Sequence, residues 1–319
     1  MTVFPGEPTV GAGRQCRREN VVLPSGTRKY LTYRVLAGFL AAAPEPVARV
    51  AGIVVGGAMW VAQPGTRAVV GGHMDRVVGP GLSIRARQGL VRRAFLSYAR
   101  YWVESARVSR YAPATIREKM VHVDGMEHLA AASAQGKGVI MALPHLGGWE
   151  LGGAWLADCG YPMTAVAEVL DPPELFSFFV NERSKLGLTI VPLGEGSGRE
   201  ILRTLRSGGL VGLICDRDIV GNGVTVGFFG ATTTLPGGPA ALSMRTGAPV
   251  LPTAVYLGPD GGHYGVIAPP IAYERTGKMG EDIVGMTQAI ATELEKLIRR
   301  APEQWHVFQP NWPEGQAGR

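Results

Sequence analysis

The stretch Lys137-Gly-Val-Ile-Met-Ala-Leu-Pro-His-Leu-Gly-Gly-Trp-Glu150 carries the signals that decide the fold. Its uninterrupted apolar run, residues 139–143, has the length of a strand buried on both faces. Pro144 ends that strand, so His145 emerges at its tip, and two glycines then open a helix. A buried strand followed directly by a helix is the repeating unit of α/β proteins.

The same alternation continues on the carboxyl side of residue 121. Strands are predicted at 139–143, 163–169, 188–192, 210–215, 250–257 and 264–267. Helices are predicted at 147–158, 173–186, 198–206, 238–246 and 282–299. This order predicts an α/β fold with a central mixed sheet flanked by helices on both faces.

Helical patterns dominate before residue 119. Residues 87–110 repeat apolar side chains near helical spacing, with arginines between them, and we attribute this stripe to core packing. Two apolar helices are predicted at 30–43 and 47–61, separated by prolines. They either pack on the core or lie in a membrane interface. The longest uncharged apolar run, 50–62, is shorter than the ~20 residues that a spanning helix needs.

These patterns predict a flexible leader at 1–29 and a single domain at 30–319. Within that domain, 30–118 form a helical, membrane-facing extension and 119–319 form the α/β part that carries the candidate site.

The charge of the chain limits its partners. The net charge of the 319 residues is +6. A basic surface suits nucleic acid, anionic lipid or phosphorylated small molecules. The arginines are dispersed and no nucleic-acid-binding signature occurs, so we expect the last two. Cys16, Cys159 and Cys215 show neither C-x-x-C nor metal-ligand spacing, so neither a disulfide framework nor a metal site is predicted.

His145 is the candidate general base. Ligands of α/β sheets bind at the carboxyl ends of the strands, where His145 lies. Glu150 follows in the first turns of the next helix, so its carboxylate can fold back to one ring nitrogen and leave the other to deprotonate a hydroxyl. Free N–H groups near Gly147 and Gly148 are predicted to stabilise a developing oxyanion. The alternative is a structural histidine followed by a helix-capping glutamate.

A covalent intermediate on the protein is the rival chemistry. No serine has glycine two positions before and two positions after it, so the nucleophile elbow is absent. The cysteines show no His/Asp partner pattern. Direct attack by an activated substrate hydroxyl fits the sequence better.

Several motifs together resemble one enzyme family. Gly136–Ile140 with His145–Glu150 resembles the H-x4-D/E motif of the lysophospholipid acyltransferase superfamily, and especially of the lipid A late acyltransferases. The stretch 216–218, followed by 226–230, resembles their D-x-D…V-x-F-F-G block. Further agreement lies at 123–129, 181–183 and 246–252, and the resemblance covers 30–312. The ending, 304–312, is more similar to the actinobacterial phosphatidylinositol mannoside acyltransferases.

The resemblance implies an O-acyltransferase that moves a long acyl chain, palmitoyl for example, from acyl-CoA to a mannose hydroxyl of phosphatidylinositol mannoside. It implies no cofactor besides acyl-CoA as donor substrate. It also implies a peripheral (monotopic) protein on the cytoplasmic face of the plasma membrane, with an anionic membrane surface and a glycolipid acceptor as partners. The alternatives are another glycolipid or lysophospholipid acceptor, such as one like lipid A, or an inactive lipid-binding protein.

The resemblance also gives roles to supporting residues. Asp216 occupies the acidic position near the catalytic histidine, where a carboxylate orients either His145 or the sugar hydroxyl; the alternative is an ion pair with an arginine. Asp218 belongs to the same block. Arg183 could bind a phosphate of CoA or of the lipid headgroup, since its planar fork suits phosphate oxygens, or it could be a solvated helix residue.

Two further charged residues are candidates for substrate binding. Arg245 is the only charge in the small and apolar stretch 237–250, so it needs either an acidic partner or the phosphates of the donor. Glu168, at the end of a predicted strand, could hold a sugar hydroxyl or pair with Arg183.

Overall fold

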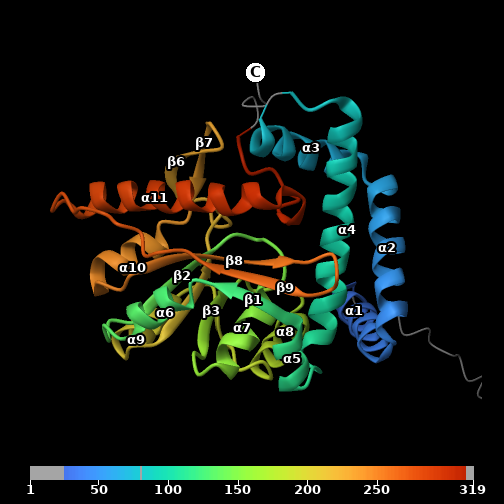
Figure 1. The fold of residues 1–319 in the computed structure, drawn as a ribbon, viewed down its shortest axis with the longest axis horizontal. Helices are drawn as coiled ribbons and strands as arrows, with labels where there is room; N and C mark the ends of the chain where they lie inside the picture. The colour runs from blue at the N-terminus through green and yellow to red at the C-terminus, as the bar shows by residue number, and fades with distance from the viewer. Residues whose placement is uncertain (1–24, 80, 314–319) are drawn as a thin grey trace, which may run out of the picture.

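The computed structural model describes residues 25–79 and 81–313. A helical amino-terminal part stands beside a sheet that is covered by further helices (Figure 1). The helical part contains α1 (Ser25–Ala42), α2 (Glu45–Ala62), α3 (Pro64–Val78) and α4 (Ile84–Val108). The predicted leader lies outside the described residues as far as residue 24, and residues 25–29 belong to α1.

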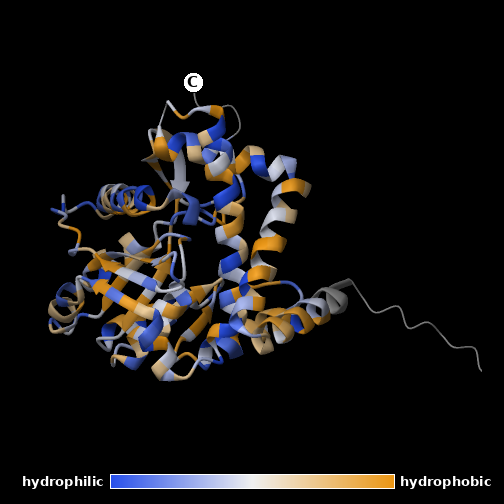
Figure 2. Cartoon of the chain, turned by 45° about the vertical axis from the view of Figure 1, so that its right-hand side comes forward, coloured by the Kyte–Doolittle hydropathy of each residue, from blue (hydrophilic) through white to orange (hydrophobic). Residues whose placement is uncertain are grey.

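Small residues set the packing of α2 on α4. Ala48, Gly52 and Gly56 are the buried residues of α2. A Cβ atom added at Gly56 would lie 2.9 Å from the carbonyl oxygen of Phe95, so only glycine permits this approach. The opposite face of α2 is exposed and apolar (Figure 2): Val50 is 59% exposed and Val54 63%. By length and composition alone, α2 is the described helix that could cross a bilayer.

The main sheet has seven strands in the order β1-β9-β8-β2-β5-β3-β4. Its strands are β1 (Met120–Asp124), β2 (Val139–Leu143), β3 (Met163–Ala167), β4 (Thr189–Pro192), β5 (Leu210–Ile214), β8 (Val250–Leu257) and β9 (His263–Ile267). Strands β8, β2, β5, β3 and β4 run parallel, whereas β9 is antiparallel to β8. The mixed sheet is therefore confirmed.

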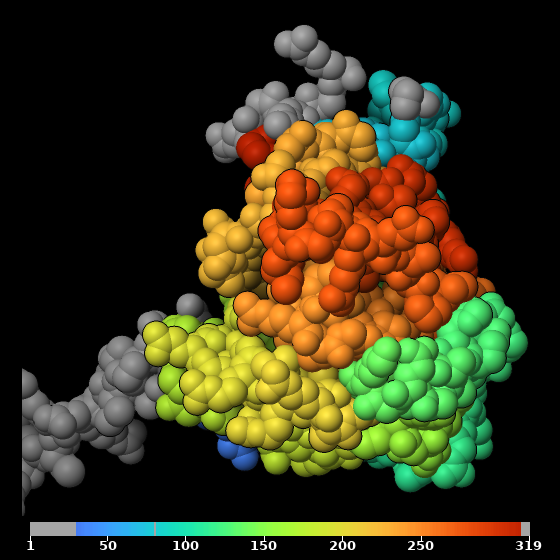
Figure 3. Space-filling view, turned by 90° about the vertical axis from the view of Figure 1, so that its left-hand side faces the viewer, coloured from blue at the N-terminus to red at the C-terminus, as the bar shows by residue number. Residues whose placement is uncertain are grey.

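Helices cover both faces of this sheet. They are α5 (Pro113–Lys119), α6 (Met126–Ser133), α7 (Trp149–Asp158), α8 (Pro173–Ser184), α9 (Ser197–Arg206), α10 (Gly238–Thr246), α11 (Met279–Arg300) and the short η1 (Pro302–Gln304). Alternate residues of β2 enter two cores: Ile140 and Ala142 pack under α9, α10 and α11, and Met141 and Leu143 pack with α5, α6 and α7. Figure 3 shows α6, α9 and α10 side by side on the surface.

Strand β1, helix α6 and the hairpin of β6 and β7 were not predicted. Strand β1 is a short, largely exposed edge strand, and its five residues, Met-Val-His-Val-Asp, contain no continuous apolar run. Strands β6 (Val224–Phe228) and β7 (Ala231–Leu235) form a separate antiparallel hairpin, turned by Phe229 and Gly230 with φ of 49° and 74°. The next helix after β2 begins at Trp149 rather than at residue 147, because Gly147 adopts φ of 60°.

Candidate active site

A histidine–carboxylate pair forms at the carboxyl ends of two neighbouring strands. His145 follows β2 and Asp216 follows β5, which pair in parallel, so both residues leave the sheet at one edge. The Nδ1 atom of His145 lies 2.6 Å from Oδ1 of Asp216, and the backbone N–H of His145 donates to Oδ2 at 2.8 Å. The other ring nitrogen, Nε2, is thereby left for the adjoining cavity.

Asp216 is buried and well supplied with donors. Besides the two bonds from His145, its Oδ2 accepts a 2.6 Å hydrogen bond from Nε1 of Trp305, a fully buried side chain. Burial alone would raise the pKa of Asp216, but the charge of His145 and the hydrogen bonds from His145 and Trp305 hold it below its usual value. Asp216 is therefore ionised at neutral pH, which fixes the tautomer of His145 and stabilises an imidazolium.

Glu150 does not contact His145, so the pairing expected from their spacing is wrong. Its Oε1 lies 2.9 Å from Nη2 and 3.1 Å from Nε of Arg183 on α8. The glycine turn and the start of α7 at Trp149 direct Glu150 toward α8. The guanidinium of Arg183 also lies 4.9 Å from the ring centre of Trp149. Of the roles considered for Asp216, its hydrogen bonds match orientation of His145.

We expect the Glu150–Arg183 ion pair to stabilise the folded protein around the site. Both side chains are mostly buried, 5% and 17% exposed. Replacing Arg183 with methionine leaves Glu150 buried without its partner, so the free energy of unfolding should fall by about 3–5 kcal/mol in urea titrations. The control is Lys185→Met, which removes an exposed ion pair with Glu182 and should cost at most about 1 kcal/mol. Equal losses in the two variants would contradict this assignment.

The glycines after His145 do not offer an oxyanion site. The N–H of Gly147 donates to the carbonyl oxygen of Gln304 at 3.1 Å, and that of Gly148 donates to Val255 at 3.0 Å. A Cβ atom at Gly147 would overlap the Val255 carbonyl oxygen. The glycines therefore let this segment lie between β8 and the carboxyl-terminal segment, and their N–H groups are already occupied.

The carboxyl-terminal segment completes the site, and we did not predict this. The backbone N–H of His306 donates to the carbonyl oxygen of His145 at 2.7 Å, and Nδ2 of Asn311 donates to that of Asp216 at 3.0 Å. The ring of His306 lines the cavity, with Nε2 2.9 Å from Oγ of Ser97. Burial, with a smaller effect of nearby His145, lowers the pKa of His306 to about 3, so this ring stays neutral.

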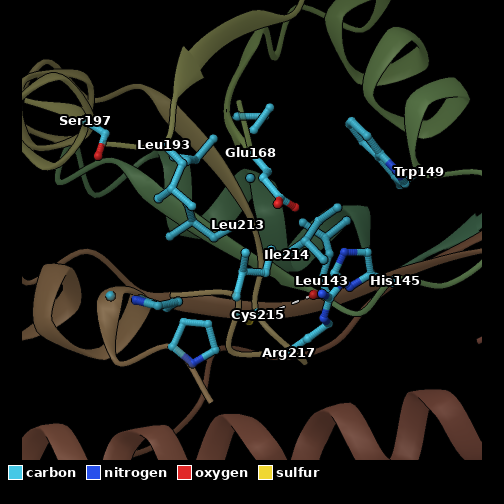
Figure 4. Close-up of a pocket in the computed structure, with 18 of the residues that line it drawn as sticks. Leu143, His145, Trp149, Glu168, Leu193, Ser197, Leu213, Ile214, Cys215 and Arg217 are labelled. Carbon is cyan, nitrogen blue, oxygen red and sulfur yellow. Dashed lines mark hydrogen bonds between the residues drawn. The ribbon is translucent and has the colours of Figure 1, made fainter. Parts of the chain in front are cut away.

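A cavity of about 620 Å³ extends from His145. In Figure 4, His145 and Trp149 stand at one end of the view and Ser197 at the other. Most of its lining is apolar, from several strands and from α4, α8, α9 and α10. Examples are Trp102, Leu143, Met163, Ala165, Phe179, Ile190, Leu193, Ile201, Leu213, Ile214 and Leu242. Its volume lies within the range of about 300–1,000 Å³ of small-molecule sites.

Charged residues also line this cavity. Arg245 is exposed at the end of α10, and among the described residues it forms no ion pair with an acidic side chain. Glu168 is exposed too, and among the described residues it forms no ion pair, with Arg183 or otherwise. Arg217, which we did not predict, lies beside His145 (Figure 4). Arg217, Arg245 and Glu168 are therefore available to polar parts of a substrate.

Asp218 also lines the cavity, but its carboxylate is already engaged. It accepts hydrogen bonds from the N–H groups of Gly221 and Gly223, both at 2.8 Å, and from Oγ1 of Thr234 at 3.0 Å. Asp218 therefore orders the loop between β5 and β6.

No described cysteine or serine lies in hydrogen-bond contact with His145. Cys215 lines the cavity, but burial raises the pKa of its thiol, which disfavours the thiolate. Ser197, at the far end, donates its hydroxyl to the carbonyl oxygen of Gly194 at 2.8 Å. Among the described residues, the arrangement thus favours attack by a substrate hydroxyl.

The site combines a histidine–carboxylate pair with a mostly apolar cavity, an arrangement suited to enzymes that activate a hydroxyl for attack on a group carried by an apolar substrate. The chain belongs to the bacterial lipid A biosynthesis acyltransferase family, whose family model matches residues 23–314.

Individual relatives of this chain also carry the names of acyltransferases. The chain is 34% identical over 280 residues to the phosphatidylinositol mannoside acyltransferase of Mycolicibacterium smegmatis, covering 86% of this chain and 89% of that protein. Its identity to the Mycobacterium tuberculosis protein of the same name is 34% over 293 residues, with 90% of each covered. A lipid A biosynthesis acyltransferase of Haemophilus influenzae is 28% identical over 185 residues, covering 57% and 55%.

Proposed function

We propose that this protein transfers a long-chain fatty acyl group, such as palmitoyl, from acyl-CoA to a mannose hydroxyl of phosphatidylinositol mannoside. The observation that carries the proposal is the His145–Asp216 pair at one end of the apolar cavity of about 620 Å³. The relatives named phosphatidylinositol mannoside acyltransferases, which align over most of both chains, support the choice of acceptor.

The proposed reaction needs one base and no covalent intermediate. Nε2 of His145 takes the proton of the mannose hydroxyl as its oxygen attacks the thioester carbonyl carbon. The tetrahedral intermediate then collapses, the C–S bond breaks, and the imidazolium returns the proton to the departing CoA sulfur. Asp216 stabilises the imidazolium between these steps, and His306, being neutral, adds no opposing charge.

The charged residues of the cavity fit the polar parts of the substrates. We assign Arg217 and Arg245 to the phosphates of CoA, because guanidinium groups bind phosphate oxygens through paired donors. Glu168 is exposed beside the reacting end and suits a sugar hydroxyl (Figure 4). Arg183, bound to Glu150, and Asp218, bound to its own loop, are assigned to support of the site instead.

We propose peripheral attachment to the cytoplasmic face of the plasma membrane, and the exposed apolar face of α1 and α2 supports attachment to a membrane. On α1, Val35 and Phe39 are 71% and 60% exposed. Helix α2 packs along α4 through its glycines, which favours a position in the interface over one across the bilayer.

Incubation of the purified protein with palmitoyl-CoA and a panel of acceptors tests this function. We expect CoA release that depends on phosphatidylinositol mannoside, with an acylated product found by mass spectrometry. Release that depends instead on a lipid A precursor or a lysophospholipid would replace the acceptor. Free fatty acid without acceptor dependence would indicate a hydrolase. If palmitoyl-acyl carrier protein reacts and palmitoyl-CoA does not, the donor assignment is wrong.

A further inference from the structure

A second cavity, of about 330 Å³, lies on the other side of α4 from the reaction cavity. Tyr98, Tyr101 and Trp102 of α4 face the reaction cavity, whereas Arg93, Arg100 and other residues of the opposite helical face line the second one. Its other walls are α2, η1 and the turn between β8 and β9, which reaches α4 in Figure 1. Helix α4 therefore separates two independent spaces.

The charged lining of this second cavity has four arginines and three glutamates. Its charged residues are Arg49, Arg93, Arg100, Arg107, Glu45, Glu104 and Glu303. Glu45 is neutralised by Lys119, whose Nζ lies 3.0 Å from Oε1. Glu104 lies between Arg100 and Nε2 of His263, at 3.6 and 3.2 Å. Glu303 forms no ion pair with any described residue. With Glu45 neutralised by Lys119, the four arginines of the cavity outnumber its remaining acids, so the cavity carries an excess of positive charge.

Arg100 is held in the wall of this cavity. Its Nη1 donates to the carbonyl oxygen of Gly258 at 2.7 Å, which fixes the guanidinium against the β8–β9 turn. Its Nη2 is buried and has no hydrogen-bond partner, since Glu104 at 3.6 Å is beyond hydrogen-bond range. Because Nη2 is enclosed by the protein, Arg100 contributes positive charge at the wall of the cavity and leaves direct bonding of a ligand to other residues.

Two other arginines remain available at this cavity. Neither Arg49 nor Arg93 forms an ion pair within the described part of the chain, and both are exposed. Arg49 lies over the β8–β9 turn, since a Cβ atom added at Gly261 would be 2.7 Å from its Nη2. Arg107, by contrast, already donates to the carbonyl oxygens of Leu40 and Ala43 at 2.6 Å.

The basic cavity adjoins the apolar face of α2. Ile53 lines the cavity and is itself 53% exposed, and Val50 and Val54 are also exposed on α2. A charged pocket that opens beside an apolar strip matches a molecule with an anionic group and apolar chains. We propose that this cavity binds the phosphate of an anionic phospholipid of the bilayer, with its acyl chains along α2, at a site separate from the reaction cavity.

Calorimetric titration of the full chain with monomeric dihexanoyl phosphatidylglycerol tests the site without turnover. We expect saturable binding that the double change Arg49→Gln and Arg93→Gln weakens roughly ten- to a hundredfold, because hydrogen bonds to charged groups are lost. The control, Arg85→Gln with Arg92→Gln, removes the same charge from exposed positions of α4 outside both cavities and should bind like the unchanged protein. Turnover of palmitoyl-CoA should be the same in both variants.

Two further ligands test whether the cavity binds an anionic phospholipid or any phosphate group. Inorganic phosphate and zwitterionic dihexanoyl phosphatidylcholine should each bind at least about tenfold more weakly, since one lacks chains and the other net charge. Equal affinity for inorganic phosphate would make this a free-anion site and overturn the lipid assignment. Equal weakening in the control pair, or none in the cavity pair, would overturn the site itself. These results do not depend on which acceptor the enzyme acylates.

Discussion

Replacement of His145 by asparagine is expected to lower kcat by about 10²–10⁴-fold, the usual contribution of a general base. Asparagine is the informative change because its amide nitrogen can still donate to Asp216, where Nδ1 of His145 lies 2.6 Å away. The variant therefore loses the atom that accepts the substrate proton but keeps the buried carboxylate partnered. Its KM for palmitoyl-CoA should change little.

Two further variants separate chemistry from folding. His145→Ala should show a similar loss of kcat and also a lower melting temperature, because buried Asp216 then loses a charge-assisted bond. His122→Ala, on the exposed edge strand β1, should match the unchanged protein in both measurements. Near-normal turnover by a folded His145→Asn variant would remove His145 from the mechanism.

The local part of the fold could be predicted from the sequence. Strand β2 was predicted with its observed bounds because an apolar run ended by Pro144 is a signal contained in neighbouring residues. The placement of His145 follows from it. Asp216 could be expected nearby, because residues that end adjacent parallel strands share one edge of the sheet.

The partner of Glu150 could not be predicted in this way. Each residue of a helix turns the side-chain direction by about 100°, so a start at Trp149 instead of residue 147 redirects Glu150. Its ion pair with Arg183 depends on where α8 lies, which the spacing between His145 and Glu150 does not contain.

The carboxyl-terminal contacts were missed for a different reason. Trp305 reaches Asp216 across 89 residues of sequence, and it follows a helix in a segment without periodic pattern. In the sequence alone, the ending 304–312 indicates only a branch of the family. The structure gives the same residues a physical role, because they hold both members of the pair: Trp305 and Asn311 bind Asp216, and His306 binds His145.

Replacement of Asp216 by asparagine should reduce kcat by about 10²–10⁴-fold although His145 is intact. The two oxygens of Asp216 face three donors, two from His145 and one from Trp305. An amide has only one oxygen, so its NH₂ group must face a donor. If it donates to Nδ1 of His145, the imidazole proton moves to Nε2, which can no longer accept the substrate proton.

Stability against pH gives Asp216 a second, independent signature. Because the pKa of Asp216 is held below its usual value in the folded protein, its ionised form contributes stability above the usual carboxyl pKa. That contribution is lost as the pH falls through the lowered folded pKa. The free energy of unfolding of Asp216→Asn should therefore lie furthest below that of the unchanged protein near pH 7 and approach it in acid. The control Asp158→Asn removes a surface ion pair with Arg117 at the end of α7 and should leave kcat unchanged. A gap that stays constant between pH 7 and pH 3, with normal kcat, would mean that Asp216 does not act as an ionised partner of His145.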